Sequence, residues 1–131
     1  MPAVYSCPSS SGGEFGETSY MVLTGKGMLF DDDNKTATTE IRDGAENTIM
    51  LVEINDAQVS WSSPQDIDTA TISWNIDRDA KGIGSPHKSG TQMATADGKV
   101  YRYSRLLPAE QLRAMATENG GEPVKPTDWA E

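Results

Sequence analysis

The sequence predicts a single strand-rich α+β domain, with a mainly antiparallel sheet and a C-terminal helix. Three observations predict this class: an unbroken apolar segment at 47–54, a hairpin pattern around Asp97-Gly98, and one helical apolar stripe near the C-terminus. The 131 residues suffice for one compact domain. We expect a flexible lead-in at 1–17, the globular domain at 18–121 and an extended tail at 122–131.

Strands are predicted where short segments are rich in β-branched and aromatic residues. These segments are 18–24, 47–54, 58–61, 69–75, 91–96 and 99–104. The segment 47–54 is the most apolar of these and is rich in β-branched residues, which suits a strand buried on both faces. Asp97-Gly98 lies between two of the strands and predicts a type I′ hairpin turn. The segment 82–90 is rich in glycine and is expected to be a loop.

One helix is predicted over 108–119. Pro108 suits the first helical position, and Leu112, Met115 and Ala116 form an apolar stripe at helical spacing. Gly120-Gly121 supplies a C-terminal stop. Leu107 precedes the proline and cannot cap the helix, so we expect an N-terminal end that is either weak or capped by another group.

The acidic composition excludes several classes of partner. Lys and Arg number 11 against 20 Asp and Glu, a formal net charge of -9. Binding to nucleic acid needs a cationic surface, and so does docking on anionic lipid. No apolar segment approaches the roughly 18 residues of a transmembrane helix, and residues 1–7 do not resemble a signal peptide.

The sequence contains no motif for nucleophilic catalysis, and we expect no catalytic residues. A hydrolase is the least favoured alternative and would require His87 beside a nucleophile or two carboxylates that face each other in a cleft. His87 is the only histidine, and Ser85 is separated from it only by a proline, unlike a strand-to-helix nucleophile elbow. Cys7 is the only cysteine, so an intrachain disulfide is impossible and a thiol-based metal site is not expected. We expect Cys7 to act as a small buried hydrophobe.

Glu53 is the one acid inside the apolar segment 47–54. Strand alternation would place it on the same face as Leu51 and Ile49, so we expect partial burial and an internal ion pair that fixes the strand register. Its candidate partners are Arg102, Arg105 and His87.

Two binding hypotheses remain open beside a purely structural role. Asp31, Asp32 and Asp33 form an acidic loop with the hard oxygen ligands that calcium uses, although the EF-hand pattern is absent. Apart from this calcium hypothesis, no cofactor is expected. Trp61, Trp74 and Trp129 would suit a glycan-stacking platform if exposed, but we expect Trp61 and Trp74 to be buried in or beside the sheet.

Two sequence patterns together resemble a known family. His87 is followed after nine residues by Asp97-Gly98, and Asp43-Gly44 is followed by Asn47-Thr48 and then by Glu53. In this order the pieces resemble the H-x9-DG prepilin-like proteins abundant in planctomycetes, a family labelled a domain of unknown function. Cys7-Pro8-Ser9 near the start, and Leu112-Arg113-Ala114 through Gly120-Gly121-Glu122 near the end, also resemble family segments, so the likeness covers nearly the whole chain. It corresponds to the C-terminal half of a typical member, because the family's prepilin cleavage site and long hydrophobic helix are missing from this sequence.

The resemblance implies a pilin-like or pseudopilin-like head without its N-terminal helix. Such a head would lie outside the cytoplasm, in the periplasm or on the cell surface, and meet other pilin-like subunits or proteins of a type II secretion-like system. Any membrane attachment would come through the missing helix. The signature residues His87, Asp97, Gly98, Asp43, Gly44, Asn47, Thr48 and Glu53 are expected to hold the fold, with His87 hydrogen-bonded to a turn or to the carboxylate of Glu53 or Asp97.

Overall fold

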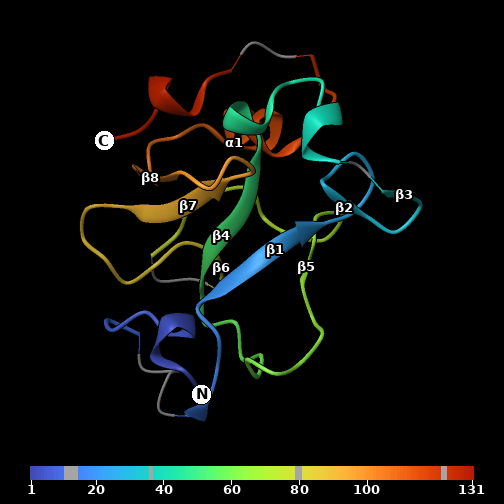
Figure 1. The fold of residues 1–131 in the computed structure, drawn as a ribbon. Coiled ribbons are helices and arrows are strands. Elements are labelled where there is room, and N and C mark those ends of the chain that lie inside the picture. Colours follow the sequence, from blue (N-terminus) through green and yellow to red (C-terminus); the bar gives the residue numbers. More distant parts are fainter. Residues whose placement is uncertain (11–14, 36, 79–80, 122–123) are drawn as a thin grey trace.

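The computed structural model describes residues 1–10, 15–35, 37–78, 81–121 and 124–131. A mixed, mostly antiparallel sheet with the strand order β3-β2-β1-β4-β7-β8 forms the centre, and one α-helix follows it, as predicted (Figure 1). The main strands are β1 (Tyr20–Thr24), β4 (Ile49–Asn55), β7 (Thr91–Thr95) and β8 (Val100–Tyr103). Each pairs antiparallel with its neighbour in that order.

Short elements extend the sheet and connect its strands. The two-residue strands are β2 (Phe30–Asp31), β3 (Asn34–Lys35), β5 (Ile67–Asp68) and β6 (Gly82–Ile83). Strands β2 and β5 run parallel to β1, and β6 pairs with the end of β4. The 3-10 turns are Ala3–Tyr5, Thr38–Glu40, Ala45–Asn47 and Pro126–Asp128.

Four predicted strands are confirmed, and two are wrong. The segment 58–61 holds only an isolated bridge between Glu17 and Ser60, because Gln58 takes a φ of 54° that a strand does not accommodate. The segment 69–75 begins instead with a turn. The carboxylate of Asp68 accepts the Ala70 N–H, and its carbonyl accepts the Thr71 N–H. The expected loop at 82–90 also begins with β6, which the sequence did not indicate.

The hairpin between β7 and β8 is confirmed, but its turn is not of type I′. Gly98 has a φ of 85°, whereas Asp97 does not have a positive φ, so only one of the two central residues meets the type I′ requirement. The Gly98 N–H donates to the Thr95 carbonyl, which closes a turn over Ala96 and Asp97. A turn followed by a glycine in the left-handed backbone conformation is typical of hairpin loops with more than two residues.

A β-bulge in β4 changes which residues share a face. Ile49 pairs with Thr95 and Leu51 pairs with the adjacent Ala94, so one extra residue, Met50, is inserted. Consequently Ile49 turns into the core, while Leu51 lies half-buried on the other face. The expectation that Ile49 and Leu51 flank Glu53 on one face is therefore wrong for Ile49.

Helix α1 (Ala109–Ala116) packs on the core side of the sheet, against one end of β4. Its predicted stripe of Leu112, Met115 and Ala116 is fully buried, in one cluster with core residues such as Val52 and Met93. Pro108 stands at the N-cap and not at the first helical position, and no side chain caps this end. In Figure 1, α1 lies by one end of β4, and the N-terminal segment lies by the other.

The described C-terminal residues return to the sheet. Ala130 bridges to Tyr103 in β8, and Pro126 is buried. Within the described ranges, no helix combines the length and apolar character needed to cross a membrane.

Candidate functional site

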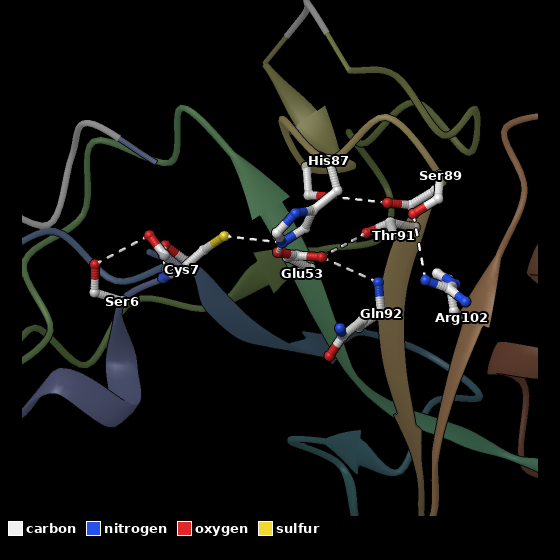
Figure 2. Close-up of polar contacts among 11 residues, drawn as sticks. Ser6, Cys7, Glu53, His87, Ser89, Thr91, Gln92 and Arg102 are labelled. Carbon is white, nitrogen blue, oxygen red and sulfur yellow. Dashed lines mark hydrogen bonds and ion pairs between the residues drawn. The ribbon is translucent and has the colours of Figure 1, made fainter. Parts of the chain in front are cut away.

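Glu53 places a carboxylate inside the protein. It lies in β4 opposite Tyr20 of β1, and only 1% of its surface is exposed. Its Oε2 accepts the Gln92 backbone N–H at 3.0 Å and the Thr91 hydroxyl at 3.3 Å, both from the start of β7 (Figure 2). Its Oε1 has no hydrogen-bond partner among the described residues. The predicted partial burial is thus an underestimate.

Cys7, in the N-terminal segment, lies close to this carboxylate. Its backbone N–H donates to the Ser19 hydroxyl at 2.9 Å, and the Ser19 N–H donates to the Tyr5 carbonyl, so the segment is tied to the residue before β1. Cys7 is 1% exposed, so its predicted burial is confirmed. The thiol does not simply fill apolar space, however, because it faces polar groups.

His87 completes the cluster from the loop between β6 and β7. Its Nε2 lies 3.2 Å from the Cys7 Sγ and 3.5 Å from the Glu53 Oε1. Figure 2 shows the imidazole edge directed at both side chains. The predicted contact between His87 and Glu53 is confirmed, while Arg102 instead donates to the Ser89 hydroxyl. We call Cys7, Glu53 and His87 the buried triplet.

The electrostatics of the triplet disfavour the thiolate form of Cys7. Burial is the main cause that raises the pKa of Cys7, and the nearby Glu53 carboxylate adds to it. Burial also raises the pKa of Tyr20, with further contributions from Glu53 and Cys7. A catalytic cysteine needs a lowered pKa, so this environment opposes a thiolate nucleophile.

The geometry also differs from a catalytic triad. In a triad the nucleophile and the carboxylate contact opposite nitrogens of the imidazole. Here the single nitrogen Nε2 faces both Cys7 and Glu53. Ser85 is buried, and its hydroxyl donates a hydrogen bond to the Gly90 carbonyl. The arrangement suits a hydrogen-bonded lock or the convergence of three ligands on one cation.

Asp97 lies at the opposite end of β7 from His87, so the two halves of the H-x9-DG pattern do not meet. Strand β7 has five residues, so its two ends are about 13 Å apart. The Asp97 carboxylate accepts the Thr95 hydroxyl and the Lys99 backbone N–H, and it pairs with the Lys99 ammonium at 3.0 Å. These contacts lower the pKa of Asp97 to about 2, with the Thr95 hydroxyl as the largest cause.

The Asp43-Gly44 segment ties the start of β4 to the region after α1. The Asp43 carboxylate accepts the backbone N–H groups of Gly120 and Gly121 at 2.8 and 3.0 Å. The Asn47 side chain donates to the Asp43 carbonyl, and the Thr48 hydroxyl donates to the carbonyl of Gly44. The side chains of Asp43, Asn47 and Thr48 therefore all form hydrogen bonds with backbone groups and fix the path of the chain.

The acidic loop does not gather its carboxylates. Asp31 accepts the N–H groups of Gly27 and Asp33, while Asp32 and Asp33 are exposed. In the part of the chain that the structure describes, the buried triplet is the one group of three potential metal-ligating side chains of the Cys, His, Asp or Glu type. Calcium at Asp31, Asp32 and Asp33 stays a prediction.

The tryptophans lie apart from the triplet. Trp61 stacks on Tyr5 with ring centroids 5.6 Å apart, and both are more than 40% exposed. The expected burial of Trp61 is therefore wrong, because the predicted strand at 58–61 does not form. Trp74 packs partly buried against the core, and Trp129 is exposed.

Sequence reasoning paired Glu53 with His87 but missed Cys7 as the third member. The available signal was the rarity of the residues: one cysteine, one histidine and one acid inside the apolar strand. Comparisons with protein-family models, with curated proteins and with solved structures found no match.

Proposed function

We propose that the chain is a non-enzymatic, extracytoplasmic head domain of a prepilin-like or pseudopilin-like protein, with a structural or assembly role. The observation that carries this proposal is the use of the signature residues. Asp97, Asp43, Asn47 and Thr48 direct their polar atoms at backbone or at hairpin neighbours. A pattern that holds a scaffold together favours a structural module over an enzyme.

The open face of the sheet supports an assembly role. Helix α1 packs on the core side of the sheet, and the other face carries a groove of about 240 Å3 without any charged lining residue. The groove is lined by Val4, Tyr20, Leu51, Val52, Gln92, Met93, Ala94 and Val100. An uncovered apolar surface on an otherwise acidic protein favours an apolar partner.

We assign this groove to the long hydrophobic helix of a pilin-like subunit. The lack of charge in the groove suits an apolar helix, because no ionic group needs to be desolvated. A helix on this face would complete a layered arrangement in which both faces of the sheet are covered.

Site-specific photo-crosslinking in the native host tests the proposal. A crosslinker replaces Val100, which lines the groove and is 62% exposed. The matched control replaces Ala70, an exposed turn residue outside the groove. We expect the Val100 position alone to capture a protein with a prepilin-type hydrophobic helix. Capture of cytoplasmic proteins only, or no difference between the two positions, contradicts the proposal.

A second candidate, a glycan-binding module, is favoured by the exposed Tyr5–Trp61 stack. Exposed aromatic faces are suited to pack against sugar rings. Saturable quenching of tryptophan fluorescence by an oligosaccharide, abolished by Trp61→Ala and retained in Trp129→Ala, would favour this candidate. Quenching that is unchanged in Trp61→Ala would exclude this stack as the site.

A further inference from the structure

The buried triplet brings together three ligand types from distant parts of the chain. Cys7 belongs to the N-terminal segment, Glu53 to β4 and His87 to the loop before β7. Their ligand atoms all lie within 4.8 Å of one another. The fold therefore converges a thiol, a carboxylate and an imidazole on one point, although no two of them are close in sequence.

The separations agree with a tetrahedral metal site. With ordinary Zn–S, Zn–N and Zn–O bond lengths, tetrahedral angles require about 3.6 Å between sulfur and nitrogen and about 3.4 Å between nitrogen and oxygen. The observed distances are 3.2 Å from Cys7 Sγ to His87 Nε2 and 3.5 Å from Nε2 to Glu53 Oε1. These two separations are within a few tenths of an ångström of the required values, and the third, from Cys7 Sγ to Glu53 Oε1, is at most 4.8 Å.

The imidazole of His87 alone does not satisfy both of its neighbours. Within the described ranges, Glu53 Oε1 is buried without a partner at ordinary hydrogen-bond distance, and at 3.5 Å its contact with Nε2 is long for a strong hydrogen bond. A single hydrogen on Nε2 cannot be directed at both the Cys7 sulfur and Oε1, so without an ion the weak S–H donor of Cys7 has to make the second contact. A cation between the three atoms would engage all of them at once.

The surroundings hold two of the three ligands in place. Glu53 is fixed through its other oxygen by Thr91 and Gln92, and the backbone of Cys7 is fixed by Ser19. Contacts of this kind orient ligands in metal sites and are part of their affinity. The His87 side chain is 31% exposed, which leaves a side of the cluster near solvent.

We propose that Cys7, Glu53 and His87 bind one divalent transition-metal ion of the zinc type. A thiolate with an imidazole and a carboxylate suits zinc or cobalt, whereas calcium and magnesium prefer oxygen ligands only. Three protein ligands leave the fourth tetrahedral position for water or an exogenous ligand. Binding displaces the thiol proton to solvent, since only the thiolate is a ligand. This site does not depend on the assembly role proposed above.

Cobalt titration of the reduced, untagged, chelator-treated chain tests the site. We expect saturation at one equivalent of Co2+, with thiolate-to-cobalt charge-transfer absorption and the ligand-field bands of a tetrahedral ion. Zinc should displace the cobalt. Cys7→Ser should abolish the charge-transfer absorption, and His87→Gln should weaken zinc binding at least 100-fold in competition with a chromophoric chelator. Asp32→Asn, in the acidic loop, is the matched control and should bind as the wild type does.

A second measurement needs no variant and so does not depend on whether the substitutions fold. In the wild-type chain, zinc should protect Cys7 from a thiol-alkylating reagent and raise the unfolding temperature, whereas calcium should do neither. Failure of the wild type to bind cobalt or zinc overturns the proposal. So does zinc binding that is unchanged in folded Cys7→Ser and His87→Gln, or equal protection of the thiol by calcium.

Discussion

The Sγ of Cys7 and the Nε2 of His87 lie 3.2 Å apart, although 80 residues of chain separate them. This contact joins the N-terminal segment to the loop before β7, and it passes directly beside the carboxylate of Glu53. The polar centre of the protein is therefore built from chain segments that come together only in the folded state.

Replacement of Glu53 should show how strongly this centre stabilises the fold. Glu53→Ala removes the acceptor for the Gln92 N–H and the Thr91 hydroxyl and leaves a cavity, so we expect a loss of about 3 kcal/mol in the free energy of unfolding. Glu53→Gln keeps the shape and one acceptor oxygen, and we expect a loss of about 1 kcal/mol. Urea unfolding of the metal-free proteins measures both, and equal losses would contradict the assigned role of the Glu53 oxygen.

The sequence predicted the elements whose signals are local. The apolar segment of β4, the glycine-containing hairpin and the stripe of Leu112, Met115 and Ala116 each depend on near neighbours, and all three formed. The bulge at Met50 and the two-residue strands depend on partners far along the chain. Their positions therefore left no local pattern in the sequence.

The candidate site was predictable only in part for the same reason. An acid inside an apolar strand requires a partner, which led to Glu53 and to His87 among three choices. Cys7 sits in a segment rich in serine, glycine and proline, where no periodicity indicates burial. Its place in the site follows from the hydrogen bonds of Ser19 to the segment around it, which are visible only in the structure.

Asp43 should anchor the segment after α1. Asp43→Ala removes the acceptor of the Gly120 and Gly121 N–H groups, so we expect a loss of about 1–2 kcal/mol in the free energy of unfolding. The two glycine amides should also exchange with solvent faster, which hydrogen exchange followed by NMR measures. Unchanged exchange at both amides would refute the assigned contact.

Asp97 should make the hairpin sensitive to acid. Its pKa in the folded protein, about 2, is below the ordinary pKa of aspartate. The ionised carboxylate therefore stabilises the fold at every pH above that ordinary pKa. That contribution is lost as the pH falls from about 4 toward about 2. We expect the wild type to be more stable than Asp97→Asn at pH 6, with the difference shrinking across this range. Thermal unfolding against pH measures it, and a constant difference is the contrary outcome.

Gly90 and Gly98 both have positive φ angles, 122° and 85°. They should nevertheless differ in how well they tolerate substitution by alanine. A Cβ on Gly90 would overlap the backbone carbonyl of Tyr103, whereas a Cβ on Gly98 meets no atom within 4 Å. We expect Gly90→Ala to cost about 3 kcal/mol or more, and Gly98→Ala only about 1 kcal/mol from backbone strain. Denaturant midpoints of the two variants test this order, and the reverse order would contradict the close approach at Gly90.

Tyr103 should tolerate the loss of its hydroxyl. The side chain is fully buried, and within the described ranges its oxygen has no hydrogen-bond partner, while burial raises its pKa. Because an unpaired buried hydroxyl carries a desolvation penalty, Tyr103→Phe should leave the free energy of unfolding unchanged or raise it by about 1 kcal/mol. Tyr101→Phe, on a half-buried neighbour in β8, is the control and should change it little. A loss of more than about 1 kcal/mol in Tyr103→Phe would mean that the hydroxyl makes a stabilising hydrogen bond.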